Sequence, residues 1–101
     1  MLLCLISYPN DGRKCKYFIN GLIRSGMVAC VQRINNVKSY YMREGEMKAE
    51  NEKILLLKLK AENKEKILAY INKNHPYDIP EIIWLQPDDV SDAYLQWVKN
   101  S

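Results

Sequence analysis

The residues able to do metal or acid–base chemistry gather around one motif. His75 is the only histidine of the chain and opens the run His-Pro-Tyr-Asp-Ile-Pro-Glu at residues 75–81. A neutral imidazole is a good ligand for copper, zinc or nickel, but a firm transition-metal site needs three or four ligands. Cys4 and a carboxylate, or further copies of the chain, are candidates to complete one. The alternative is that His75 ends a helix, where a partly positive ring suits the last carbonyls.

A second set of polar residues surrounds the same motif. Two prolines stiffen the loop around Tyr77, which favours a small preorganised pocket with Glu81 and Lys58 as its charged members. Lys58 stands in an otherwise apolar stretch, and a buried lysine needs a carboxylate partner, for which Glu52 and Glu81 are the candidates. The alternative to a pocket role is that Glu81 pairs with Lys58 or caps a backbone amide at a subunit interface.

Other chemistry is not indicated by the sequence. No phosphate-binding loop, nucleophile elbow or paired-carboxylate spacing occurs, so we expect a protein that is not an enzyme. The three cysteines are odd in number and form no Cys-x-x-Cys pair, which predicts reduced thiols and a cytoplasmic location. No obligatory cofactor is expected.

Secondary-structure elements must position these residues. The periodicity of the hydrophobic residues predicts the order β-α-β-β-α-β, followed by a tail helix. The expected strands are residues 2–7, 28–34, 38–43, 47–60 and 81–86, the second and third being one strand broken or bent at Asn35 and Asn36. The expected helices are residues 13–24 before Gly26, 64–74 capped by Asn63, and a tail helix capped by Ser91 or Asp92. Glu44 and Gly45 supply the turn of a long hairpin. This order predicts an α+β, ferredoxin-like antiparallel sheet with both main helices on one face.

The composition fits one domain over residues 1–101, with 48% hydrophobic and 27% charged residues. The net charge is +3, and basic residues alternate with acidic ones instead of forming a patch, which argues against a nucleic-acid partner. No apolar run approaches the length of a membrane span.

The strand at residues 47–60 predicts assembly. Leu55, Leu57 and Leu59 share one face, while Ile54 and Leu56 make the other face apolar as well. A sheet covered by helices on one side should be polar on the other, so we expect a partner surface there. The alternative is that the tail helix folds back over this face.

Residues 75–81 resemble the HPYxxPE signature of the CutA divalent-cation-tolerance family. The resemblance continues through Ala29-Cys30-Val31, Ser39 and Tyr41, Glu44-Gly45, and Tyr94, Leu95 and Trp97. It implies a homotrimer of ferredoxin-like protomers with strands that cross subunit boundaries, and a role in tolerance to divalent metal ions, with copper binding in some members. Of the three copper positions of a bacterial relative, only His75 is retained, because the other two hold Ile6 and Asn74.

Two functions follow as expectations. The first is a cytoplasmic trimer that binds copper or another divalent ion through His75 and Cys4. The second is a trimeric module, similar to PII signalling proteins, that places a small ligand in a cleft between subunits. The expected cleft comprises Lys58, Tyr77, Glu81, Glu52 and Tyr41.

Overall fold

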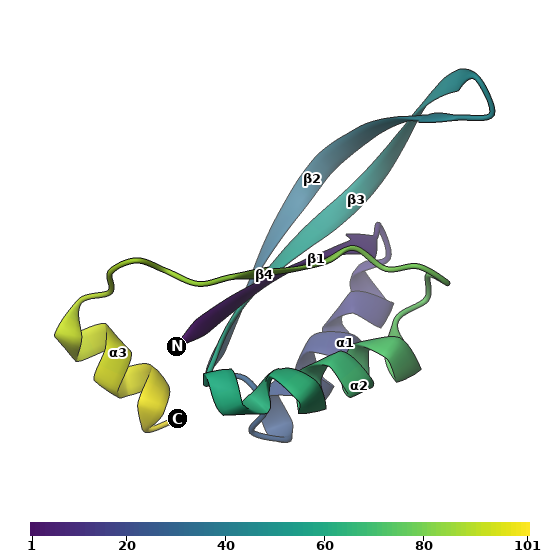
Figure 1. The fold of residues 1–101 in the computed structure, drawn as a ribbon. Coiled ribbons are helices and arrows are strands. Elements are labelled where there is room, and N and C mark those ends of the chain that lie inside the picture. Colours follow the sequence, from purple (N-terminus) through teal and green to yellow (C-terminus); the bar gives the residue numbers. More distant parts are fainter.

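Four strands form one antiparallel sheet in the order β2-β3-β1-β4, and the computed structural model describes all of residues 1–101. The elements are β1 (Leu2–Pro9), α1 (Gly12–Arg24), β2 (Cys30–Arg43), β3 (Glu46–Leu59), the short 3-10 helix η1 (Ala61–Asn63), α2 (Lys64–Asn74), β4 (Ile82–Leu85) and α3 (Asp92–Lys99). Helices α1 and α2 lie side by side on one face of the sheet (Figure 1). The α+β, ferredoxin-like prediction is therefore confirmed.

The core lies between the two helices and one face of the two central strands. Side chains alternate across a strand, and Leu55, Leu57 and Leu59 of β3 are fully buried on the helix side. The β1 partners Ile6 and Cys4, opposite Leu55 and Leu57, are also fully buried. Helix α1 completes the layer with Cys15, Phe18 and Leu22, and α2 with Ile67 and Ile71.

Helix α1 begins one residue earlier than predicted because Asp11 caps it. The Asp11 carboxylate accepts a hydrogen bond from the backbone N–H of Lys14 at 3.0 Å, which satisfies one of the free amides of the first turn. The helix ends at Arg24, and Gly26 follows with a φ of +78°, the conformation expected of glycine at such a stop.

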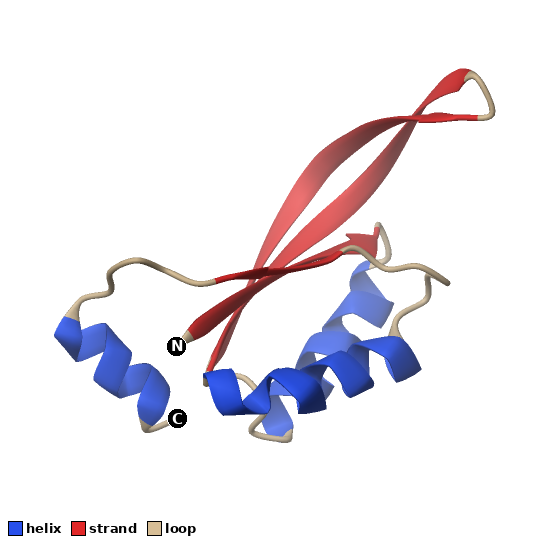
Figure 2. Ribbon diagram, viewed as in Figure 1, coloured by secondary structure: helices blue, strands red, loops and turns tan.

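The long hairpin of β2 and β3 rises well beyond the helices (Figure 2). Its two-residue turn has positive φ at both positions, 52° at Glu44 and 79° at Gly45, as a type I′ turn requires. The two extended stretches predicted for β2 are one strand, because Asn36 adopts a φ of 61° and takes up a register shift between Ile34 and Val37.

Two predicted details are wrong. Asn63 precedes α2, but its side-chain amide makes no cap and instead donates to the carbonyl oxygen of Met27 at 3.2 Å, tying α2 to the loop after α1. Ser91 likewise makes no side-chain cap at α3. No helix of the protein is both long enough and apolar enough to cross a membrane.

Candidate ligand groove at the base of the hairpin

His75 lies where the chain leaves α2 and turns back toward the sheet. Its Nε2 is 2.7 Å from the carbonyl oxygen of Ser7, and its Nδ1 is 3.1 Å from the backbone nitrogen of Tyr77. Because a backbone N–H can only donate, Nδ1 accepts and Nε2 carries the proton that it donates to Ser7. The ring is therefore neutral. Burial lowers the pKa of His75, and the Ser7 carbonyl and the Glu52 carboxylate oppose that effect.

The imidazole is also packed on three sides by aromatic rings. Its centroid lies 5.1 Å from that of Tyr8, 5.8 Å from that of Phe18 and 5.1 Å from that of Tyr77. His75 does end α2, as the alternative prediction had it, but the backbone N–H of His75 and not its ring bonds to the Ile71 carbonyl. The ring instead joins β1, α1 and the loop after α2.

The structure does not present His75 and Cys4 as a pair of metal ligands. Both nitrogens of His75 already have partners, and Cys4 is fully buried on the core face of β1. Burial raises the pKa of the Cys4 thiol to about 12, which keeps it protonated at neutral pH, whereas a thiolate is the ligand form. No group of three or more His, Cys, Asp and Glu side chains has metal-site spacing.

Tyr77 ties the loop to the base of the hairpin. Its hydroxyl donates to the Glu52 carboxylate at 2.7 Å, and Glu52, on β3, is only 8% exposed. Burial and this hydrogen bond raise the pKa of Tyr77, so the phenol stays protonated. On the same hairpin the Tyr41 hydroxyl donates to Glu50, and the Arg43 guanidinium lies 5.9 Å from the centre of the Tyr41 ring.

These side chains line a groove of about 800 Å³, which we call the hairpin groove. Four of the five predicted cleft residues are among its walls, namely Tyr41, Glu52, Tyr77 and Glu81. Sequence reasoning missed the remaining walls, Ser7, Arg43, Glu50, Pro76, Asp78 and Ile79. Glu50 could have been found, because it stands two residues before Glu52 and so shares its face of the strand.

The comparison with known proteins decides the family. Residues 2–101 match the CutA1 divalent ion tolerance protein family. The chain belongs to that family. In this CutA-family chain, the HPYxxPE motif places Tyr77 and Glu81 in the hairpin groove. It also places His75 against the Ser7 carbonyl of β1.

Relatives and solved structures agree with that assignment. The chain is 35% identical over 100 residues to the chloroplastic protein CutA of Arabidopsis thaliana, covering 99% of this chain and 54% of that protein. It is 28% identical to the divalent-cation tolerance protein CutA of Pyrococcus horikoshii, covering 97% and 94%. The CutA1 crystal structure from Ehrlichia chaffeensis matches with a TM-score of 0.92 at 27% identity, covering 98% of this chain and 92% of that one. The chain thus spans about half the length of the plant relative.

Within one chain, Lys58 does not belong to the hairpin groove. Lys58 and Glu52 do share a face of β3, but six residues of strand separate them by roughly 20 Å. Lys58 is half-buried at the far end of the sheet, and its ammonium donates to the side-chain oxygen of Gln32 on β2. A neutral amide therefore takes the place of the expected carboxylate.

The buried lysine of this CutA-family chain is Lys53, which is 8% exposed. Its ammonium donates to the side-chain oxygens of Asn10 at 3.2 Å and Asn35 at 3.1 Å, one at the end of β1 and one at the irregularity of β2. The asparagine pair that bends β2 thus has a second role, because it supplies an acceptor for a buried cation.

The face of the sheet opposite the helices stays uncovered. It carries Ile34, Ile83 and Leu85 at 52%, 44% and 43% exposure, beside Leu5 and Leu56 of the central strands. The alternative that the tail helix folds over this face is wrong, because α3 lies beside the N-terminus, away from the hairpin tip (Figure 1). There it buries Val98 near residues 60–62.

Proposed function

We propose that this chain serves in divalent-cation tolerance as a homotrimer, with the hairpin groove as the ligand site between subunits. The observation that carries the proposal is the charge of the groove. Four carboxylates line it, from Glu50, Glu52, Asp78 and Glu81, against one guanidinium from Arg43. Carboxylates gathered in a concave site produce a negative potential that raises the local concentration of cations.

Assembly is supported by two exposed apolar surfaces that a monomer would leave in water. One is the uncovered sheet face described above. The other is the hairpin tip, where Tyr40, Met42 and Met47 are 64%, 67% and 71% exposed. Cross-strand register places Met42 opposite Met47, so this apolar surface is continuous across the two strands.

The oligomeric state can be tested by light scattering on Ile83→Glu, which puts a charge on the uncovered face. We expect the wild type to be a trimer and the variant to dissociate. The matched control is Ile23→Glu on α1, because Ile23 is similarly exposed, at 41% against 44% for Ile83, but lies outside that face. A monomeric wild type, or a variant that stays trimeric, would contradict the proposal.

The donors of the hairpin groove favour a hard divalent ion, and a second subunit would have to supply further ligands, because no three such side chains of one chain have metal-site spacing. Carboxylate and phenol oxygens suit Mg²⁺, Ca²⁺ or Mn²⁺, whereas copper prefers imidazole and thiolate. Copper binding through His75 and Cys4 stays a separate proposal, which requires His75 to give up a hydrogen bond.

Calorimetric titration of Mn²⁺, Zn²⁺, Cu²⁺ and Cu⁺ separates the two metal proposals. Glu52→Gln removes the charge but keeps an acceptor for Tyr77, and it should weaken Mn²⁺ binding about tenfold or more. His75→Gln and the control Glu65→Gln, which lies outside the groove, should not. Copper binding that depends on His75 and not on Glu52 would support the His75–Cys4 site instead.

The size of the hairpin groove favours a second candidate, a small organic ligand as in a PII-like module. A volume of about 800 Å³ exceeds what an ion needs, and Ile79, 91% exposed, adds apolar surface beside Tyr77. A thermal-shift screen of nucleotides and small anions, repeated on Arg43→Gln, tests it. A ligand that stabilises the wild type but not the variant would support this reading, and the absence of any such ligand would count against it.

We place this function in the cytoplasm and assign it no reaction. The three thiols Cys4, Cys15 and Cys30 are unpaired, which is the usual state of cysteines in a reducing compartment. Binding, not catalysis, is the role that the hairpin groove supports, because its one histidine neighbour has both ring nitrogens engaged.

A further inference from the structure

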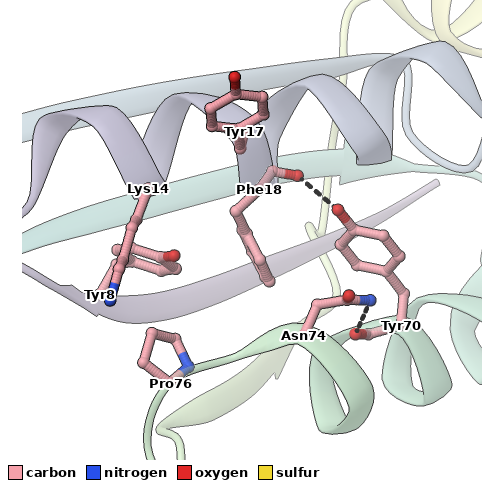
Figure 3. Close-up of a pocket in the computed structure, with 7 residues that line it drawn as sticks. All are labelled: Tyr8, Lys14, Tyr17, Phe18, Tyr70, Asn74 and Pro76. Atoms are coloured by element: carbon pink, nitrogen blue, oxygen red, sulfur yellow. Dashed lines mark hydrogen bonds between the residues drawn. The ribbon is translucent and has the colours of Figure 1, made fainter.

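A second groove, of about 400 Å³, lies between α1 and α2 on the helix side of the protein. We call it the helix groove. Figure 3 shows its walls, with Lys14, Tyr17 and Phe18 from α1, Tyr70 and Asn74 from α2, Tyr8 from β1 and Pro76 from the loop after α2. Only Pro76 is shared with the hairpin groove, so nothing proposed above accounts for this one.

The helix groove is lined by a buried residue, Tyr8, whose hydroxyl has no partner in the chain. Tyr8 is 2% exposed, with its ring packed 5.1 Å from Phe18 and 5.1 Å from His75, and its hydroxyl makes no hydrogen bond within the chain. No polar side-chain atom that is sealed from solvent lacks a partner, so this hydroxyl must reach solvent, and it does so at the helix groove. Burial raises the pKa of Tyr8 to about 12, which keeps its O–H available as a donor.

The neighbouring polar groups are already committed. The Tyr70 hydroxyl donates to the Phe18 carbonyl at 2.9 Å, and the Asn74 amide donates to the Tyr70 carbonyl at 3.0 Å, as drawn in Figure 3. The free donor at the floor is therefore Tyr8. An unpartnered hydroxyl in a largely apolar groove gains by meeting an acceptor.

The charge of the helix groove has the opposite sign to that of the hairpin groove. Lys14 is the one charged residue among its walls, and its ammonium forms no ion pair. Asp11 caps α1 and keeps its negative charge, which adds to the rise in the pKa of Tyr8, but it is not a wall of the helix groove, and α1 itself contains no acidic residue. The Tyr8 hydroxyl and the Lys14 ammonium are two donors that carry one positive charge between them, which suits the two oxygens and the single negative charge of a carboxylate.

We propose that the helix groove binds a small monocarboxylic acid with an apolar body. The carboxylate accepts from the Tyr8 hydroxyl at the floor and from the Lys14 ammonium, and the body lies against Phe18 and Pro76. A dianion such as phosphate is disfavoured, because the walls provide one positive charge, the donors of Tyr70 and Asn74 are engaged, and the Tyr17 hydroxyl points away from Tyr8 and Pro76 (Figure 3). The proposal is separate from the metal and trimer proposals, since Pro76 is the only residue that it shares with the hairpin groove.

The test is a titration of benzoate into ¹⁵N-labelled protein, followed by amide chemical shifts. We expect saturable shifts in residues of α1, α2 and the loop after α2. Benzamide has nearly the same shape without the charge and should bind about tenfold more weakly. Tyr8→Phe removes only the hydroxyl and should weaken benzoate by about tenfold. Lys14→Gln should weaken benzoate binding severalfold. Lys16→Gln removes an equal charge two residues further along α1, outside the groove walls, and should not change the binding.

Two results would overturn the proposal. Either benzoate causes no saturable shifts at tens of millimolar, in which case water alone occupies the groove, or it binds Tyr8→Phe and Lys14→Gln as tightly as the wild type. The amide spectrum shows whether Tyr8→Phe folds. If it does not, the proposal is still tested by comparing Lys14→Gln with Lys16→Gln and benzoate with benzamide.

Discussion

The two grooves lie on either side of the His75 ring and differ in the sign of their charge. The hairpin groove is lined by four carboxylates around Tyr41 and Tyr77, whereas the helix groove has Lys14 and the hydroxyl of Tyr8. His75 contacts Tyr8 on one side and Tyr77 on the other, and it is neutral. The comparison teaches that the histidine of the HPYxxPE motif, which lines neither groove, is a partition in contact with one tyrosine of each, and that the ligands proposed for the two grooves differ because their charges differ.

Removing the partition should have the largest effect. His75→Ala loses the hydrogen bonds to Ser7 and Tyr77 and the packing of three aromatic rings, so we expect a loss of about 3 kcal/mol in the free energy of unfolding. Urea denaturation measures it, with the adjacent exposed Asn74→Ala as control. A loss no greater than that of the control would mean that the ring does not hold the two grooves in place.

Tyr77→Phe should disturb the hairpin groove alone. It leaves the buried Glu52 carboxylate without its 2.7 Å donor, which should cost about 2 kcal/mol of stability. Tyr17→Phe is the matched control, because the Tyr17 side chain is 72% exposed and its hydroxyl has no partner. Equal losses in the two variants would show that the Tyr77–Glu52 bond contributes nothing to the fold.

Gly21→Ala should disturb the helix groove alone. A Cβ at this position would overlap the Tyr70 hydroxyl and displace it from the Phe18 carbonyl. The lost bond and the better helix propensity of alanine oppose each other, so we expect a net loss of about 1 kcal/mol or less. Amide shifts should change around Tyr70 and Phe18 but not around Glu52. Shifts that spread equally to both grooves would contradict the partition.

The smallest expected effect concerns pH. Burial holds the pKa of His75 below its ordinary value of 6.5, so the unfolded chain takes up a proton at this residue before the folded one does. Lowering the pH from about 7.5 to about 5 should therefore decrease stability through His75. Urea denaturation across this range should show a smaller acid loss in His75→Gln. An identical pH profile in wild type and variant would contradict a neutral buried ring.

Local patterns predicted most of the fold. Alternation in β3 placed Leu55, Leu57 and Leu59 on one face, and Glu44-Gly45 identified the hairpin turn, because these signals depend only on neighbours in sequence. The same alternation placed Glu52 and Lys58 on one face but could not give the distance between them, and this is why Lys58 was assigned to the wrong end of the sheet.

The two grooves depended on contacts between distant segments. The motif indicated that Tyr77 and Glu81 lie near a pocket, and the structure adds Glu50 and Arg43 from the hairpin. Nothing local distinguishes Tyr8 from the other tyrosines, because its unpartnered hydroxyl follows from the packing of α1 and His75 around it. The proposed Cys4–His75 pair meets a similar limit, since alternation did not show that the face of β1 that Cys4 shares with Ile6 is the core face.

The acceptors of Lys53 have a consequence for the chemical ageing of the protein. Asn35 presents a neutral oxygen to a buried ammonium, and Asn36, the next residue, adopts a left-handed backbone conformation. Deamidation of Asn35 to aspartate would replace that oxygen with a carboxylate and turn a hydrogen bond between an ammonium and a neutral acceptor into a salt bridge. Damage of this kind, which commonly loosens a protein, would here tighten the junction between the bent strand and the core.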